Sequence, residues 1–324
     1  MSKHAAVMAG NGYSRTAAPQ QKESGSDAAG LVCAVVVSYF PGEELDALLQ
    51  QLPAQVAQVV VIDNTPDATS ASLLQKKKEF VPRVHHIANG HNAGIAVALN
   101  QGLSYAVEAG YKWIVTLDQD TDCLPDMVST LVAVSRACGP AAAVIGGNYH
   151  DPRSGRTKVA AGERECFYEQ KTVITSGSLI DVRFAVSIGG FREDYFIDQV
   201  DHEFCLRVRA RGGKVVISCK PVMTHSVGRE GGAKIPFLGA LPRHPPLRKY
   251  YIARNTVVTV AQYWWREPQW CLRRMTRLLL GLGEMALLEE QRIDKVRAFF
   301  LGIVDGLSRR MGPCGRESIL RLQQ

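Results

Sequence analysis

A pair of carboxylates follows one of the most apolar stretches of the chain. Residues 112–118 (KWIVTLD) predict a buried strand, and Asp118, Gln119 and Asp120 stand at its end. Two carboxylates one residue apart, with Thr121 beside them, supply the oxygen ligands that a hard divalent cation prefers. Such a cation would neutralise a diphosphate and stabilise the charge that develops when it leaves. A solvated turn, in which Asp is common, is the alternative.

A second acidic group lies in residues 189–207 (GGFREDYFIDQVDHEFCLR). Asp198 and Asp201 are three residues apart, which places them on one side at the start of a predicted helix. Carboxylates at that position can simply cap the helix. The Gly-Gly turn and the aromatic residues before them favour a walled cleft instead. In such a cleft a carboxylate can act as a general base toward a hydroxyl group.

Polar residues also follow other predicted strands. Asp63, which Asn64 follows, could accept the imide N–H of a pyrimidine or begin an Asx turn. Residues 89–94 (NGHNAG) place backbone N–H groups at a helix start, where a phosphate can bind, but they match neither G-x-G-x-x-G nor the P-loop. His225 precedes a basic loop and is either structural or a ligand of a metal or diphosphate.

The elements that must position these residues alternate between strand and helix. Strands are predicted at residues 31–38, 58–63, 83–88, 112–118, 141–147, 172–181 and 214–219, and helices at 43–52, 72–80, 92–110, 125–138 and 200–212. This order predicts an α/β fold with a mostly parallel central sheet and helices on both faces. Ligands of such sheets bind beyond the carboxyl ends of the strands, where the polar residues described above lie.

The composition of the 324-residue chain excludes several classes of protein. Hydrophobic residues make up 46% and charged residues 21%, as in a globular protein, and no apolar run is long enough to predict a membrane-spanning helix. Residues 241–324 carry 15 Lys and Arg against 7 Asp and Glu, whereas the rest of the chain is nearly neutral. A neutral body argues against nucleic-acid binding. The amphipathic basic C-terminal helices predict either core packing or contact with an anionic membrane surface.

The eight cysteines are scattered and include no C-x-x-C pair, which argues against a structural zinc site. Several stand inside apolar runs, as is typical of buried thiols in a reducing compartment. The N-terminus has no apolar region of the kind found in a secretory signal.

In this order the motifs resemble those of the inverting family 2 glycosyltransferases of the GT-A fold, and among them the bacterial rhamnosyltransferases. The likeness covers roughly residues 31–310. Its segments are VVVSY (35–39), VVVIDN (59–64), NAGIAVALNQG (92–102), LDQDT (117–121), TSGSLI (175–180), residues 189–207, THSVG (224–228) and LRKYYIARN (247–255). FIDQVDHEFCLR together with YYIARN is similar to enzymes that use dTDP-L-rhamnose. A narrower likeness, based on HPPLRKYYIARN and KVRAFFLGIVDGL, is to the rhamnosyltransferases of rhamnolipid synthesis.

The resemblance implies a role for each of these residues. Asp201 would be the general base and Asp198 would support it, because the family's usual Glu-Asp pair is Val200-Asp201 here. Asp120 and His225 would bind Mg2+ or Mn2+. The residues that would bind the nucleotide sugar are Ser38, Tyr39, Asp63, Asn64, Asn92, Gly94, Asp118, Gln119 and Arg254.

Composition and the resemblance together predict four segments. They are a disordered leader (1–30), a GT-A catalytic domain (31–226), a mobile basic loop with the start of an active-site helix (227–255), and a helical basic tail (256–324).

The implied reaction is a single displacement that moves L-rhamnose from dTDP-L-rhamnose to a hydroxyl group, which needs one base and no covalent intermediate. The expected acceptor is an amphiphilic or lipid-linked glycan at the inner face of the cytoplasmic membrane, with mono-rhamnolipid, giving di-rhamnolipid, favoured. The enzyme would then be cytoplasmic and peripherally bound to that membrane.

Three alternatives remain. A rhamnosyltransferase of O-antigen or capsular polysaccharide assembly would carry the same motifs. A nucleotidyltransferase needs a Gly-rich basic signature after the first strand, which SYFPGEE lacks. A non-catalytic nucleotide-sugar-binding protein would have no need of both Asp118 and Asp120.

Overall fold

The computed structural model describes residues 15–16, 31–66, 83–152, 155–224, 234–235, 239–240 and 244–321. Most of the predicted leader, the helix predicted at 72–80, His225 and most of the predicted basic loop lie outside the described residues.

A mixed sheet forms the centre of the protein, and its main strand order is β1-β9-β11-β7-β10-β5-β2-β3-β4. The strands are β1 (Arg15–Thr16), β2 (Val32–Ser38), β3 (Gln58–Asp63), β4 (Val84–Ala88), β5 (Trp113–Asp118), β6 (Asp122–Cys123), β7 (Ala142–Asp151), β8 (Arg156–Thr157), β9 (Phe167–Glu169), β10 (Ser178–Asp181) and β11 (Lys214–Thr224). A separate pair is formed by β12 (Lys234–Ile235) and β13 (Gly239–Ala240). The neighbours β4, β3, β2 and β5 run parallel, and so do β7 and β11, which confirms the predicted fold class.

Helices cover both faces of this sheet. The helices are α2 (Glu43–Gln51), η1 (Leu52–Ala54), α4 (Ile95–Glu108), α5 (Met127–Cys138), α6 (Val182–Ser187), η2 (Glu193–Tyr195), α7 (Val200–Ala210), α8 (Pro246–Tyr263), α9 (Pro268–Leu288), α10 (Arg292–Leu307) and α11 (Glu317–Leu320). Val32, Ala34 and Val36 of β2 pack in one core with α2 and α5. Cys33 and Val35 pack in a second core with α4. Because side chains alternate along a strand, the apolar run of β2 is buried on both faces.

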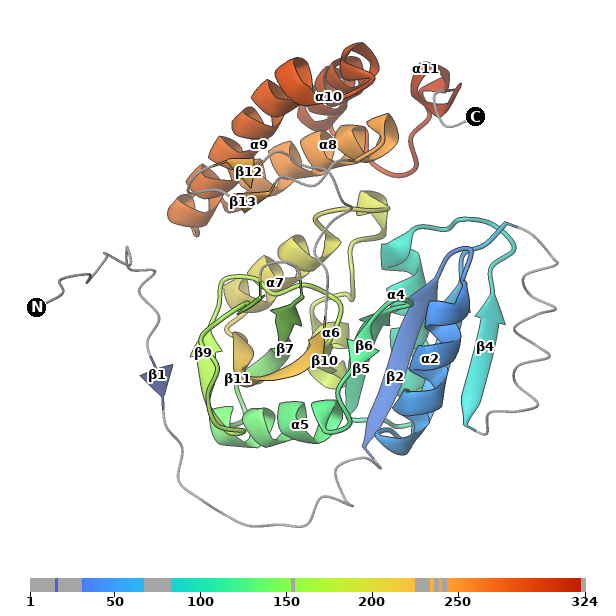
Figure 1. Ribbon diagram of the computed structural model, residues 1–324, viewed down its shortest axis with the longest axis vertical. Helices are drawn as coiled ribbons and strands as arrows, with labels where there is room; N and C mark the ends of the chain where they lie inside the picture. Colours follow the sequence, from blue (N-terminus) through green and yellow to red (C-terminus); the bar gives the residue numbers. More distant parts are fainter. Residues whose placement is uncertain are drawn as a thin grey trace, which may run out of the picture.

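The helices α8, α9 and α10 form a layer of their own beyond one end of the sheet (Figure 1). The arrows of β2 and β4 point toward this layer, so the carboxyl ends of the parallel strands face it. The contact between α8 and α10 is close, because a Cβ atom on Gly302 would lie 2.3 Å from the Tyr250 carbonyl oxygen. The domain boundary expected at residue 255 falls inside α8.

Two predicted strands differ in extent from the observed ones. The strand predicted at 172–181 is reduced to β10, because Gly177 adopts a φ of +72° and its N–H donates to the carbonyl of Thr116 at 2.8 Å. The left-handed turn at this glycine ends the extended backbone. In contrast, β11 continues five residues beyond the predicted end at Cys219, to Thr224, where it pairs with β6.

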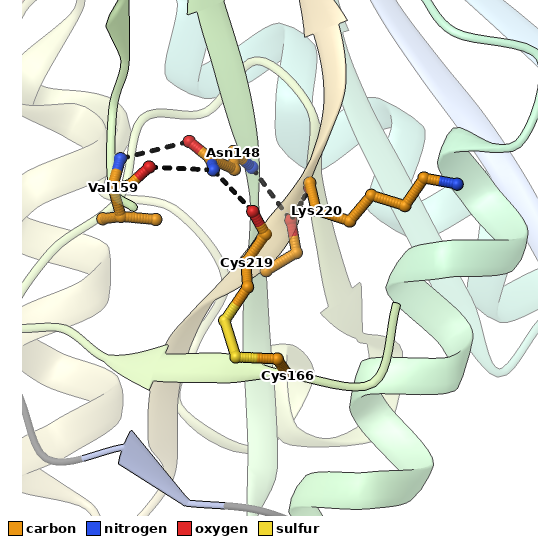
Figure 2. The surroundings of a disulfide bond; sticks show 6 residues. Asn148, Val159, Cys166, Cys219 and Lys220 are labelled. Atoms are coloured by element: carbon orange, nitrogen blue, oxygen red, sulfur yellow. Dashed lines mark hydrogen bonds between the residues drawn. A yellow bond between two sulfur atoms is a disulfide. The ribbon is translucent and has the colours of Figure 1, made fainter. Parts of the chain in front are cut away.

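A disulfide joins Cys166 to Cys219, so the expectation of buried free thiols in the apolar runs is wrong for Cys219. The other six cysteines are free. Figure 2 shows Asn148 beside the disulfide, with hydrogen bonds to Val159 and to Cys219. Its Nδ2 donates to the carbonyls of Cys219 at 2.8 Å and of Val159 at 3.2 Å. The disulfide and Asn148 therefore both tie the segment before β9 to β11. The 53-residue separation of the two cysteines carries no sequence signal of their pairing.

Candidate active site

A cavity of about 690 Å3 lies between the carboxyl ends of the strands and the C-terminal helices. Asp118, at the end of β5, and Asp198 and Asp201, around the start of α7, all line it. Arg248 of α8 and Arg274 of α9 line it from the opposite layer. Acidic residues that are about 80 positions apart in the sequence thus face one cleft.

The Asp118 carboxyl group lies in a charged and poorly hydrated environment. Burial, and after it the neighbouring Asp120 carboxylate, raise the pKa of Asp118 to about 6, while the charge of Arg248 acts in the opposite direction. Asp120 itself is exposed. Two carboxylates that repel each other at a strand end offer hard oxygen donors, which fit Mg2+ or Mn2+.

The described residues contain no cluster of three or more His, Cys, Asp or Glu side chains arranged to hold a metal ion. The two aspartates would therefore provide only part of a coordination shell. Mg2+ is commonly bound by one or two carboxylates together with substrate phosphates and water, so this donor set fits a metal that arrives with a nucleotide sugar.

Asp201 stands in the first turn of α7 and faces the cavity. Its Oδ1 accepts a hydrogen bond from the backbone N–H of His202 at 2.7 Å. Burial raises the pKa of Asp201 to about 6, and the Arg274 guanidinium is the main opposing charge. In its ionised form, a carboxyl group with a pKa near neutrality can accept a proton from a hydroxyl group.

The turn before α7 has an unusual backbone. Phe196, Asp198 and Gln199 adopt φ values of +62°, +62° and +64°, a conformation that is uncommon for residues other than glycine. Asp198 forms an ion pair with Arg248, with 2.7 Å between Oδ1 and Nη2. Three of the four residues from 196 to 199 thus have a positive φ, and only strong surrounding contacts can hold such a backbone. Backbone strain of this kind is common at functional sites.

The contacts that hold this turn come from Arg254 and Asn255 of α8. The Asn255 Nδ2 atom donates to the carbonyls of Tyr195, Ile197 and Asp198 at 2.8–2.9 Å. Arg254 is completely buried, and its Nη2 donates to the carbonyls of Asp194 and Tyr195. Arg254 does not line the cavity, so the structure places it beneath the turn rather than beside a nucleotide sugar.

The residues expected to hold the nucleoside meet at the ends of β2, β3 and β5. The Ser38 hydroxyl donates to Asp63 Oδ1 at 3.1 Å, and the Thr65 hydroxyl donates to the same oxygen at 2.7 Å. The backbone N–H of Tyr39 donates to Gln119 Oε1 at 2.7 Å. Tyr39 is about half exposed, so its ring is accessible for stacking on a base.

The remaining predicted residues link this end of the sheet to the turn before α7. Asn64 Nδ2 donates to the carbonyl of Gly94 at 3.1 Å, and Asn92 Oδ1 accepts from the Gly94 N–H at the same distance. Gly94 has a φ of +87°, and a Cβ atom there would lie 2.8 Å from the Phe196 carbonyl oxygen. The backbone of the predicted phosphate loop therefore packs directly on the strained turn.

His202 and Arg274 line the cavity although the sequence did not predict them as site residues, and Arg248, which was predicted only as part of the basic loop, lines it too. His202 and Arg248 stand beside motif residues and could have been found from that position. Arg274 and Arg277 stand three residues apart in an amphipathic helix, a spacing that places them on one face of it. That spacing alone does not distinguish a solvated face from a binding face.

The sequence is similar to one protein family and to a named relative. Residues 33–193 match the family model described as glycosyl transferase family 2. The chain is 31% identical over 289 residues to the dTDP-rhamnosyl transferase RfbF of Shigella flexneri, an alignment that covers 85% of this chain and 95% of that protein.

Solved structures share the fold at low sequence identity. S. aureus TarS is 14% identical, with a TM-score of 0.56 over 86% of this chain and 81% of the crystallised one. The mannosyltransferase PcManGT of Pyrobaculum calidifontis, crystallised with GDP-Man and Mn2+, is 15% identical, with a TM-score of 0.50 over 86% of this chain and 88% of that one. These likenesses concern the fold alone.

Proposed function

Because the chain belongs to the family 2 glycosyltransferases, we propose that it is an inverting rhamnosyltransferase that moves L-rhamnose from dTDP-L-rhamnose to an amphiphilic or lipid-linked acceptor. The observation that carries the proposal is the shared cavity of Asp118 and Asp201. The choice of donor is supported by the 31% identity with a dTDP-rhamnosyl transferase along 95% of that protein's length.

In the proposed reaction Asp201 takes the proton of the acceptor hydroxyl. The oxygen of that hydroxyl attacks the anomeric carbon at the same time. The dTDP group leaves from the opposite face of the sugar, so the anomeric configuration inverts in one displacement. The hydrogen bond from the His202 N–H orients the Asp201 carboxylate. Asp198 forms an ion pair with Arg248. We therefore assign the role of base to Asp201 and a positioning role to Asp198.

The donor would lie between the strand ends and α8. Asp63 and Tyr39 would contact the pyrimidine, with Ser38 and Thr65 holding Asp63 in place. Arg248, whose charge acts on Asp118, would lie near the diphosphate. When bound, Mg2+ or Mn2+ at Asp118 and Asp120 supplies the positive charge that neutralises the leaving diphosphate.

A panel of nucleotide sugars tests the donor assignment. Thermal unfolding is measured with Mn2+ and dTDP-rhamnose, UDP-glucose or GDP-mannose, because a ligand that binds only the native state raises its apparent stability. We expect the largest shift with dTDP-rhamnose, and a smaller one after Asp63→Ala. Equal shifts with all three donors, or none, would refute the assignment.

Mono-rhamnolipid, giving di-rhamnolipid, is the acceptor that the sequence likeness favours, and a lipid-linked glycan of O-antigen or capsular assembly is the alternative. The S. flexneri relative is named for its donor, so it is compatible with both. Mass spectrometry of reactions with dTDP-rhamnose and each acceptor separates them, since only the true acceptor gains one rhamnose.

We also propose peripheral binding to an anionic membrane surface through the outer face of α9 and α10. None of the described helices is long and apolar enough to cross a membrane. The exposed apolar residues of this face are Leu272, Leu279, Leu287 and Leu288 on α9 and Ile293, Phe300, Val304 and Leu307 on α10. Exposed Arg292 and Arg297 stand among them, which complements anionic headgroups.

Vesicle flotation tests this surface. The protein should float with phosphatidylglycerol vesicles and much less with phosphatidylcholine vesicles. Leu287→Glu should abolish flotation, whereas Val186→Glu, an exposed apolar position on α6, should leave it unchanged. Flotation that is insensitive to lipid charge and to Leu287→Glu would contradict the proposal.

A further inference from the structure

Two arginines on the α9 side of the cavity form no ion pair within the described part of the chain. Arg274 and Arg277 both line the cavity, and the only hydrogen bond of the Arg274 guanidinium to a described residue runs from Nε to Gln199 Oε1 at 3.2 Å. The two arginines also help to lower the pKa of His202 well below its usual value. Arg277 is exposed and Arg274 is partly buried, so an anion that enters the cavity would offset the cost of burying the Arg274 charge.

Two other cations of the cavity already form ion pairs. Arg248 pairs with Asp198 at 2.7 Å, and Lys249 pairs with Glu289 at 2.7 Å. The contrast shows that the fold provides acidic partners for Arg248 and Lys249 and leaves the α9 arginines available. Glu284 lines the cavity as well, but it lies seven residues beyond Arg277, about 10 Å along the helix.

The α9 arginines line the same cavity as the proposed general base. Arg248 is the cation that acts on Asp118, whereas Arg274 is the main cation that acts on Asp201. The donor diphosphate, held at Asp118, therefore has Arg248 as its neighbour. An anion bound by Arg274 and Arg277 would instead belong to the molecule that approaches Asp201, which is the acceptor.

His202 provides an independent sign of a ligand at this place. Its ring lines the cavity beside Trp270, and its buried Nδ1 atom has no hydrogen-bond partner among the described residues. Buried polar atoms are nearly always satisfied, so this atom is suited to bind a group that enters the cavity.

The wall of the cavity beyond the arginines is apolar. Leu278 and Met285 of α9, Ile252 of α8 and Phe299 of α10 line it. A ligand that fits both parts carries an acidic group and a hydrocarbon chain.

We propose that Arg274 and Arg277 form a binding site for the acidic group of an amphiphilic acceptor, with His202 as a further hydrogen-bonding group and the apolar wall as the seat of its chain. This inference rests on the proposed function, because it takes the molecule at Asp201 to be the acceptor. A carboxylate on a fatty acyl chain and a phosphate on a lipid share the required chemistry.

Titration calorimetry on the full chain tests this site with octanoate, octyl phosphate and neutral octyl glucoside, all below their micellar concentrations. We expect at least one anion to bind about tenfold or more tightly than octyl glucoside. Arg277→Gln should weaken anion binding about tenfold, and Arg277→Lys should restore most of it. Tighter binding of octanoate identifies a carboxylate acceptor, and tighter binding of octyl phosphate identifies a lipid phosphate.

Arg273→Gln is the matched control, because Arg273 is exposed on the same helix and does not line the cavity. It should bind the anions as the wild type does. Octyl glucoside that binds as tightly as both anions, or anion binding that Arg274→Gln and Arg277→Gln leave unchanged, would overturn the inference. The dTDP-rhamnose thermal shift, measured on the same samples, reports failure of the donor assignment separately.

Discussion

The side-chain amide of Asn255 donates a hydrogen bond to the backbone carbonyl of Asp198 at 2.9 Å, three residues before Asp201. The same amide reaches two further carbonyls of the turn, so one side chain of α8 fixes the backbone that presents the proposed base. The geometry of the proposed base thus depends on a helix from the C-terminal layer.

Asn255→Ala should loosen this turn and reduce both stability and turnover. Three carbonyls lose a buried donor, so we expect the free energy of unfolding to fall by about 1–3 kcal/mol. A small displacement of the base should lower kcat about 10- to 100-fold while the KM for dTDP-rhamnose stays unchanged. Urea denaturation and steady-state kinetics measure the two effects. Thr259→Ser, one turn away, keeps its hydroxyl contacts and should behave as the wild type.

Asp201→Asn should remove the base and preserve the shape of the site. We expect kcat to fall about 100- to 10,000-fold, the range over which general base catalysis contributes. The thermal shift with dTDP-rhamnose and Mn2+ should be retained, because Asp201 does not hold the donor. Rhamnosyl transfer at the wild-type rate would eliminate Asp201 as the base.

The pH dependence of kcat/KM should follow the ionisation of Asp201. Burial raises the pKa of this carboxyl group to about 6, and only its ionised form accepts a proton. Activity should therefore be constant above about pH 6 and fall about tenfold for each pH unit below it. Saturating metal favours the ionised form of Asp118, so a single ionisation should dominate. A rate that is independent of pH down to about pH 4.5 would contradict this assignment.

Gly302→Ala should disturb the packing of α10 on α8. The new Cβ atom would lie 2.3 Å from the Tyr250 carbonyl oxygen, so we expect a loss of about 1–3 kcal/mol in the free energy of unfolding. Gly283→Ala on α9 is the matched control, because no atom lies within 4 Å of its added Cβ. That substitution should stabilise the protein by about 0.5–1 kcal/mol, since alanine favours a helix. Chemical denaturation of both variants gives the comparison, and equal effects would contradict the packing argument.

The parts of the fold that sequence predicts well are those with a strong local signal. Apolar, β-branched runs such as residues 32–37 specify buried strands, and the parallel sheet follows from their alternation with helices. The place of Asp118 was predictable for the same reason, because it ends a parallel strand, whereas the place of Asp201 followed only from the likeness to the family's motif.

The remaining features depend on contacts between distant residues. The structure shows Arg254 buried beneath the turn, although its charge and its position in a motif predicted a ligand contact. The disulfide depends on where the segment before β9 meets β11, and the cation group depends on the approach of α9 to the sheet. Neither the disulfide nor the cation group produces a periodic pattern in the sequence.

The position of the cavity has a consequence for engineering acceptor preference. Its apolar wall and its free arginines come from α8, α9 and α10, whereas the expected donor residues Ser38, Asp63 and Asp118 come from the strands. Exchanging residues 244–321 for the matching helices of a relative should therefore give the chain that relative's acceptor preference. Its preference for the donor sugar should not change. Such chimaeras must also carry over Arg248, the proposed neighbour of the diphosphate, and Arg254 and Asn255, because an exchanged α8 without the last two would leave the turn before α7 without its anchor.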